Sequence, residues 1–334
     1  MISIVLPAHN EAPVLVELFT RLEAVLESLD HDFEVICVDD GSTDRTWEIL
    51  ARKAQTDCRY RCLRLSRNFG HQIALTAGLW ATKGDAVVTL DADLQHPPEV
   101  IGELLSKAGE GFEVVTAVRR LEDAEGWFKV TSARFFYRLL NRLTALDLPD
   151  GGADFRYMSR TVVDALLQMP ERHRFLRGMA RWAGYRQAMI TYERAARPAG
   201  ESKYTIRNMF RFAMDAIVSF SAVPLRIASV LGLVVSMLGG LYALYVIGVN
   251  LFTDDTVPGW TSVVVAVLVL GGVQLACIGI IGQYLGRVYE EVKGRPLFIL
   301  WEDTGTSEST ALHLPARERS GAPVHGDEPM RRDT

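Results

Sequence analysis

The sequence has few cysteines, no excess of basic charge and no leader-like beginning. Its four cysteines lack the paired C-x-x-C spacing of a zinc site, which predicts reduced thiols in a cytosol-facing protein. The formal net charge of −5 gives no reason to expect a nucleic-acid partner. The opening residues, MISIVLPAHNE, contain neither a basic region nor a long apolar run, so we expect no signal peptide.

The most informative short stretch is VVTLDADLQHPPE, residues 87–99, in which an apolar, strand-like run ends in two carboxylates. Aspartate disfavours strands, and the like charges of Asp91 and Asp93 repel unless something positive lies between them. One alternative is that Asp93 opens a turn or caps the following helix. Because hard cations bind carboxylate oxygens and Gln95 follows closely, the favoured interpretation is a divalent-cation site.

The first 120 residues alternate strand-like and helix-like patterns. Apolar runs at 2–8, 33–40, 61–66, 85–93 and 112–119 are separated by amphipathic stretches, which predicts βαβ units and a mostly parallel sheet. In such sheets ligands gather at the carboxyl ends of the strands. The polar groups that follow the predicted strands are Asn10 and Glu11, Asp39 and Asp40, Asp91 and Asp93, and Arg119 and Arg120.

The C-terminal half contains two long uncharged runs, residues 227–251 and 261–285. Each is about 25 residues long, enough to cross a hydrocarbon core of roughly 30 Å; a buried soluble helix is the alternative. Lys and Arg residues precede and follow the pair, whereas the short loop between the runs is acidic and has neither. This asymmetry predicts a membrane hairpin with both ends in the cytoplasm and the loop outside.

Several motifs carry a resemblance to a known family: LPAHNEA, VDDGSTD, SRNFGHQ, DADLQHPPE, DGGADFRYMSR and AGESKY, followed by the two apolar runs. Together they resemble the bacterial polyprenyl-phosphate glycosyltransferases of glycosyltransferase family 2. Similar patterns occur in dolichol-phosphate mannose synthase and in the undecaprenyl-phosphate glucosyl and aminoarabinosyl transferases. The resemblance covers roughly residues 1–300 and is more specific for the family than for the sugar.

The resemblance implies an α/β fold of the GT-A type, Rossmann-like with a mostly parallel sheet, in a cytoplasmic domain. Interfacial helices and a two-helix transmembrane hairpin are expected to follow. The expected boundaries are 1–204 for the catalytic domain, 205–226 for interfacial amphipathic helices, 227–251 and 261–285 for the transmembrane helices, 252–260 for an external loop, 286–301 for a cytoplasmic juxtamembrane segment and 302–334 for a disordered tail.

The resemblance also implies roles for single residues. Those that match the loop lining the donor nucleotide are Pro7, His9 (often Tyr in relatives), Asn10 and Glu11, joined by the acidic pair Asp39 and Asp40, of which the first usually contacts the base or ribose. Asp91, Asp93 and Gln95 match a DxDxQ motif that holds Mg²⁺ or Mn²⁺ against the donor diphosphate. A divalent metal would neutralise the charge that develops on that leaving group.

A lipid phosphate acceptor, with a second pKa near 6, is already mostly dianionic at neutral pH, so a strong general base is unnecessary. The enzyme must instead hold two anions together, which requires cations and positioning. The candidates, in the segment expected to approach the membrane, are Arg119, Lys129 and Arg134, with Ser132 as a neutral donor. A solvated or lipid-facing basic face is an equal alternative.

Asp154 follows a glycine pair at the position where the family has an active-site acid, so we expect it to orient the acceptor or act as a base. A turn or helix-capping aspartate is the alternative. Lys203 is expected to reach a phosphate near the interface or to be a solvated lysine at a helix start. The scattered histidines His71, His96 and His173 show no metal spacing, and no catalytic role is predicted for them.

The implied function is inverting transfer of a hexosyl or pentosyl group from a nucleotide-sugar to undecaprenyl phosphate for cell-envelope glycan modification. UDP is preferred over GDP because the glucosyl and aminoarabinosyl relatives use it. The expected location is the bacterial cytoplasmic membrane, and a homo-oligomer is allowed because relatives form tetramers. A processive polysaccharide synthase is disfavoured because Gly178 replaces the glutamine of its QxxRW motif, and a non-catalytic adaptor would require a broken metal motif.

Overall fold

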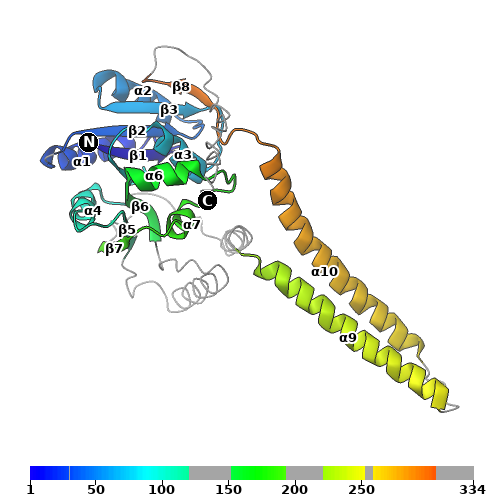
Figure 1. The fold of residues 1–334 in the computed structure, drawn as a ribbon. Coiled ribbons are helices and arrows are strands. Elements are labelled where there is room, and N and C mark those ends of the chain that lie inside the picture. Colours follow the sequence, from blue (N-terminus) through cyan, green and yellow to red (C-terminus); the bar gives the residue numbers. More distant parts are fainter. Residues whose placement is uncertain (30, 120–151, 193–220, 253–258, 306–334) are drawn as a thin grey trace, which may run out of the picture.

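The computed structural model describes residues 1–29, 31–119, 152–192, 221–252 and 259–305. These residues form an α/β domain and two long helices that project away from it (Figure 1). The domain is built on an eight-stranded sheet with the order β7-β5-β6-β4-β1-β2-β3-β8.

Five strands lie where the alternating pattern predicts them: β1 (Ile2–Ala8), β2 (Phe33–Asp39), β3 (Tyr60–Leu65), β4 (Ala86–Thr89) and β5 (Val114–Arg119). Strand β1 pairs in parallel with both β2 and β4, and β2 with β3. Strand β6 (Gly152–Ser159) lies antiparallel between β4 and β5, and β7 (Gln187–Tyr192) pairs in parallel with β5. The predicted mostly parallel sheet is confirmed.

Helices cover both faces of this sheet. The first face packs against α1 (Leu15–Ser28), α2 (Thr46–Thr56) and α4 (Ile101–Ala108), which follows the 3-10 turn η1 (Pro98–Val100). The second face packs against α3 (His71–Ala81), α6 (Arg160–Gln168) and α7 (Leu176–Trp182). Because successive strand side chains point to opposite faces, β1 serves both layers and is buried along its whole length.

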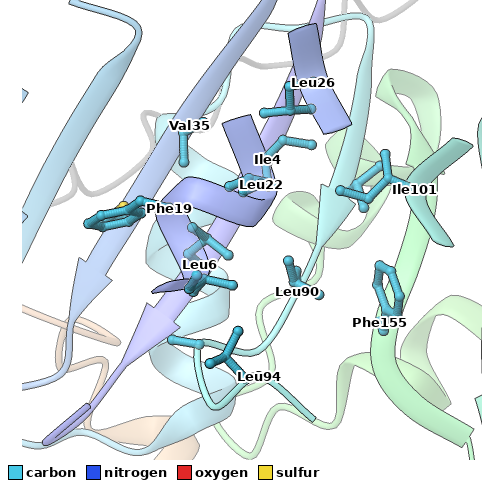
Figure 2. Packing of buried hydrophobic residues seen from close by; sticks show 14 of the residues in the cluster. Ile4, Leu6, Phe19, Leu22, Leu26, Val35, Leu90, Leu94, Ile101 and Phe155 are labelled. Carbon is cyan, nitrogen blue, oxygen red and sulfur yellow. The ribbon is translucent and has the colours of Figure 1, made fainter. Parts of the chain in front are cut away.

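The core follows that alternation. Ile4 and Leu6 of β1 join the first cluster, in which Figure 2 shows them near Leu22 of α1, while Val5 joins the second cluster. Each such fully buried aliphatic side chain contributes about 1.5–3 kcal/mol of transfer free energy. The central strand is therefore fixed from both sides, and the loops at its carboxyl end start from a rigid base.

The two projecting helices are α9 (Val223–Phe252) and α10 (Trp260–Val292), which lie side by side (Figure 1). Segments Val223–Tyr245 and Val265–Val292 are long and apolar enough to cross a membrane, and only 6% and 0% of their most apolar windows are buried. A soluble core helix would be mostly buried, so that alternative does not describe them. Of the expected interfacial segment, residues 223–226 belong to α9 and 205–220 lie outside the described residues.

One expectation for the segment after the hairpin was wrong: the disordered tail does not start at residue 302. Residues 286–292, expected in a juxtamembrane segment, continue α10, and Leu300–Asp303 form β8, an edge strand antiparallel to β3. The tail expected to be disordered from residue 302 therefore begins inside the sheet, while residues 306–334 lie outside the described part of the chain. The strand has too few residues to show a period, and its pairing with β3 is a tertiary contact.

Phe298 anchors this returning segment. Its side chain is 1% exposed and meets the ring of Trp80 in α3 edge-on, with 6.2 Å between ring centroids. Leu300 is also buried in the second cluster, whereas Trp301 is 63% exposed. The segment that follows the two long helices is therefore packed into the α/β domain.

We expect Phe298→Ala to lower the free energy of unfolding by about 3–5 kcal/mol, because it removes a buried ring and leaves a cavity. The thermal midpoint of the full chain in detergent, followed by intrinsic fluorescence, should fall by roughly 10 °C. Trp301→Ala on the same strand is the matched control and should change the midpoint little. Equal shifts in the two variants would contradict an anchoring role for Phe298.

Candidate active site

The polar clusters predicted from the sequence meet at one edge of the sheet. Strands β1, β2, β4 and β5 run in the same direction, so their carboxyl ends lie together, and the antiparallel β6 begins at that edge. The Thr89 hydroxyl at the end of β4 donates to the carbonyl of Asp154 near the start of β6. This places the acidic stretch after β4 beside Asp154.

The loop after β4 has a constrained backbone. Leu94 has a φ of +59°, in the left-handed region that a leucine rarely adopts, and its side chain is 2% exposed within the first core cluster. Asp93 Oδ1 accepts a hydrogen bond from the Gln95 amide nitrogen at 3.0 Å, and Gln95 Nε2 donates to Asp93 Oδ2. Burial of Leu94 thus holds a strained turn that fixes the Asp93 carboxylate.

The Asp91 side chain is 25% exposed, but one of its carboxylate oxygens is buried and accepts no hydrogen bond within the described structure. Its Oδ1 has no hydrogen-bond partner, although His71 Nε2 lies 3.4 Å away. Its Oδ2 lies 3.3 Å from His96 Nδ1. Burial raises the pKa of Asp91, an effect that His96 and His71 oppose. A buried carboxylate oxygen without a donor is costly unless a cation or ligand meets it, so Asp91 fits a metal ligand.

Asp154 is surrounded by donors. Arg177 Nε lies 3.0 Å from Oδ1 and its NH2 3.2 Å from Oδ2, and Arg156 NH2 lies 3.2 Å from Oδ1. Gln72 Nε2 donates to Oδ2 at 2.8 Å, and His71 Nε2 lies 3.4 Å from the same oxygen. Asp154 thereby joins α3, β6 and α7 in one network.

The charges of this network determine its protonation. Burial opposes ionisation of Asp154, but Arg177, His71 and Arg156 together hold the pKa of this carboxyl well below its usual range. Burial lowers the pKa of Arg156 to about 10, so it remains a cation at neutral pH. Burial alone would lower the pKa of His71, yet the hydrogen bond to Asp154 and the charge of Asp91 raise it above its usual value.

Sequence reasoning missed the residues that surround the two carboxylates. His71 and His96 contact Asp91, although no role was predicted for them, and Arg156 and Arg177 were not singled out. The one available signal was position: His96 follows the acidic stretch within five residues, and His71 begins a helix directly after a strand-end loop. Arg177 shows no such signal, because its proximity to Asp154 depends on the placement of α7.

The loops after β1 and β2, which the sequence predicts to line the donor nucleotide, lie at this edge. Asn10 has a φ of +59°; its backbone nitrogen donates to Ser42 Oγ at 3.0 Å, and its Oδ1 accepts from the Thr43 nitrogen at 2.8 Å. The Nδ1–H of His9 donates to the Asp40 carbonyl at 2.9 Å, and the Glu11 nitrogen donates to the Thr46 hydroxyl. Pro7, within β1, is buried. The two loops are thus joined into one surface.

The two aspartates at the end of β2, Asp39 and Asp40, have different roles. Both oxygens of Asp40 accept backbone N–H groups, from Phe69 at 2.7 Å and from Gly70 at 2.9 Å, so this carboxylate holds the loop before α3. Asp39 Oδ1 accepts from the Ser42 nitrogen, whereas its buried Oδ2 has no hydrogen-bond partner within the described structure. Burial raises the pKa of Asp39. Asp39 is therefore the member of the pair with capacity for a ligand.

Most of the residues predicted to bind the acceptor phosphate lie outside the part of the chain that the structure describes. Lys129, Ser132, Arg134 and Lys203 lie outside the described residues. Arg119 is the last residue of β5, so its backbone lies at the same sheet edge as the ends of β1 and β4. Their predicted contacts with an acceptor phosphate remain predictions.

Known proteins with similar sequences are glycosyltransferases. Residues 3–167 match the sequence profile of Glycosyl transferase family 2. An uncharacterised glycosyltransferase of Bacillus subtilis, YkcC, is 44% identical over 303 residues, which cover 91% of this chain and 94% of that protein. The SfII prophage-derived bactoprenol glucosyl transferase of Shigella flexneri is 38% identical over 299 residues, covering 90% of this chain and 97% of that protein.

Among solved structures, glucosyl-3-phosphoglycerate synthase from Mycobacterium tuberculosis, crystallised with Mn²⁺, UDP and phosphoglyceric acid, gives a TM-score of 0.45 at 23% identity. That match covers 65% of this chain and 76% of the other.

The chain is a glycosyltransferase with the GT-A fold. It belongs to glycosyl transferase family 2.

The Asp154 network predicts a pH dependence of stability. The folded-state pKa of Asp154 lies well below its unfolded value of about 3.9, so the stabilisation is present above about pH 4 and is lost as the pH falls below it. Asp154→Asn removes the charge between Arg156 and Arg177 and should lower the thermal midpoint at neutral pH. The difference in thermal midpoint between this variant and wild type should become smaller below about pH 4.

The measurement is the thermal midpoint of both proteins in detergent from about pH 7 to about pH 3. This range includes the pKa of aspartate in the unfolded chain, around which the midpoint difference should begin to change. Asp164→Asn in α6 is the control, because Asp164 is 54% exposed in its ion pair with Arg160 and should contribute little. If the difference in thermal midpoint between wild type and Asp154→Asn stays constant through the acid range, the pKa of Asp154 is not lowered in the folded protein.

Proposed function

We propose that the chain transfers a glycosyl group, with inversion, from a UDP-linked sugar to a polyprenyl phosphate, in the bacterial case undecaprenyl phosphate. The observation that carries this proposal is the unsatisfied, buried Oδ1 of Asp91 at the strand edge where Asp93, Gln95 and Asp154 also lie. The 38% identity to a protein named as a bactoprenol glucosyl transferase supports the acceptor class. The two long apolar helices support a lipid-borne acceptor.

Asp91 and Asp93 are the residues that would hold Mg²⁺ or Mn²⁺. Gln95, which the sequence predicts as a third ligand, donates its Nε2 to Asp93 Oδ2 and would orient that carboxylate. Within the described residues no group of three His, Cys, Asp or Glu side chains forms a complete cation site. This fits a metal of the Mg²⁺ type, which protein carboxylates bind through one or two ligands while substrate phosphates and waters supply the rest. Such a metal would stabilise the charge on the departing nucleoside diphosphate.

The donor nucleotide is assigned to the surface formed by the loops after β1 and β2. Asp39 Oδ2 is available to accept a hydrogen bond from the ribose or base, and His9, Asn10 and Glu11 border it. Asp40 contributes by fixing the loop before α3 rather than through a free oxygen. Preorganisation by these bonds reduces the entropy lost when the donor binds.

Asp154 positions the reacting groups instead of accepting a proton. Its pKa lies well below the usual range because Arg177, His71 and Arg156 compensate its charge, and a carboxylate so stabilised is a poor base. The acceptor phosphate needs no base, since it is largely dianionic at neutral pH. Cations close to Asp154 and the predicted Arg119, Lys129, Arg134 and Lys203, with Ser132, would offset repulsion between the acceptor phosphate and the donor diphosphate.

Membrane insertion of α9 and α10 would bring this edge to the lipid surface. The acidic loop between the helices lacks Lys and Arg, whereas basic residues border both outer ends, which favours an inner-membrane hairpin with the catalytic domain in the cytoplasm. Cytosolic nucleotide-sugar and membrane-borne acceptor would then meet at the same site.

The test of the proposal uses membranes that contain the chain, polyprenyl phosphate and a panel of radiolabelled nucleotide-sugars, with label in the organic phase as readout. Wild type should transfer sugar from one UDP-sugar in a metal-dependent manner. Asp93→Asn should abolish transfer while leaving thermal stability and membrane insertion unchanged, because it removes one of the two proposed metal ligands. Activity of Asp93→Asn within about twofold of wild type, with metal still required, would overturn the metal assignment.

A pH–rate profile tests the role of Asp154. The rate should fall as the pH drops through about 6, where the acceptor phosphate gains a proton. Asp154→Asn should lower the rate but keep the limb, since Asp154 is ionised throughout that range. Loss of the acid limb in Asp154→Asn would show that this carboxylate acts as the base.

A further inference from the structure

Three charged residues lie next to one another across three neighbouring strands. Asp39 of β2 is the register partner of Arg64 in β3, and Arg64 is the register partner of Glu302 in β8. Side chains directly opposite each other on adjacent strands share a face of the sheet and interact. Glu302, Arg64 and Asp39 therefore form a row across the sheet. It runs from β8, the edge strand that follows the long helices, to the carboxylate at the proposed donor surface.

The contacts along the row are unequal. Arg64 NH1 lies 3.0 Å from Glu302 Oε1, a hydrogen-bonded ion pair, whereas Arg64 Nε lies 3.6 Å from Asp39 Oδ2, beyond hydrogen-bond distance. Exposure decreases along the row, from 41% for Glu302 to 33% for Arg64 and 0% for Asp39. The guanidinium thus supplies charge to a fully buried carboxylate without occupying its free oxygen.

That separation matters for ligand binding. Asp39 Oδ1 is already bonded to the Ser42 nitrogen, so Oδ2 is the oxygen that a ribose hydroxyl or base N–H can reach. A buried acceptor binds such a donor most strongly when it is ionised, which requires a nearby compensating cation. A guanidinium that moved onto Oδ2 would compete with the ligand for the same lone pairs.

Two contacts hold Arg64 away from Asp39. Glu302 binds one end of the guanidinium, and the ring of Trp47 lies under the group, with 5.5 Å between Arg64 Cζ and the ring centroid. Without Glu302, Arg64 would lose its ion pair on the β8 side, and its attraction to Asp39 would be opposed less. The position of the cation therefore depends on a strand that reaches the sheet only after the two long helices.

We propose that Arg64 and Glu302 are positioning residues for the donor site, through which strand β8 keeps Asp39 charged and open to a nucleoside diphosphate. This inference rests on the proposed function, since it assumes that Asp39 contacts the donor nucleotide. The β8 strand is then part of the donor site as well as an edge of the sheet. Loss of its contact with Arg64 weakens donor binding even when the strand stays in place.

The experiment measures the dissociation constant of UDP, with Mn²⁺, for the full chain in detergent by isothermal titration calorimetry. Glu302→Gln should raise it about fivefold, and Arg64→Gln about tenfold, because each disturbs the charge beside Asp39. The double variant should resemble Arg64→Gln alone, since Glu302 acts through Arg64. In the transfer assay the donor KM should rise while kcat stays near wild type.

Asp303→Asn is the matched control on the same strand. Asp303 pairs with Arg61 at 2.7 Å, and the Arg61 guanidinium also donates to the Ala81 carbonyl, so this pair holds β8 without reaching Asp39. The Asp303 side chain is 8% exposed, so its substitution should lower the thermal midpoint at least as much as Glu302→Gln. UDP affinity should nevertheless stay within about twofold of wild type.

The outcomes separate this inference from the proposed function. If wild type binds UDP and Glu302→Gln binds it equally well, the inference is overturned and the donor assignment is kept. If Asp303→Asn loses as much affinity as Glu302→Gln, general loosening of β8 explains the effect and the inference is also overturned. If no nucleoside diphosphate in a panel of UDP, GDP and ADP binds wild type, the proposed donor class fails, and this inference fails with it.

Discussion

The charge balance around Asp154 is the interaction on which the arrangement of the active site depends. This carboxylate is buried and accepts from Arg177, Arg156 and Gln72, which come from α7, β6 and α3. Arg177, His71 and Arg156 together compensate this charge, so removing one of them would leave the buried carboxylate less well compensated. Burial of the charge therefore favours one relative position of the three elements. The same constraint places His71 between Asp154 and Asp91, and so links the network to the proposed metal ligands.

A second constraint is that the carboxylates of the site differ in how many hydrogen bonds the protein donates to them. Asp40 and Asp154 have their oxygens satisfied by protein donors and serve the structure of the site. Asp39 Oδ2 and Asp91 Oδ1, in contrast, are buried and accept no hydrogen bond from the described residues. Buried unsatisfied oxygens are rare in folded proteins because they are costly. Their occurrence at the end of β2 and after β4 supports the proposed ligand site at this edge.

The described chain also connects its long helices to the site through the sheet. After α10, Phe298 packs against Trp80 and β8 joins β3, whose Arg64 faces Asp39. The helices are therefore bordered by segments of the same α/β domain. For an enzyme that would join a water-soluble donor to a lipid acceptor, this segment would link the proposed donor surface to the apolar helices.

The sequence by itself determined the alternating strands, the apolar helices and the acidic stretch Asp91–Gln95, because period, length and strand-end position are local properties. Only the tertiary structure decided that Arg177 and His71 meet Asp154, and that Glu302 lies in a strand instead of a disordered tail. Those contacts join residues far apart in the chain, so no local pattern encodes them. They arise where burial of a charge requires a partner and the packed helices and strands bring one within reach.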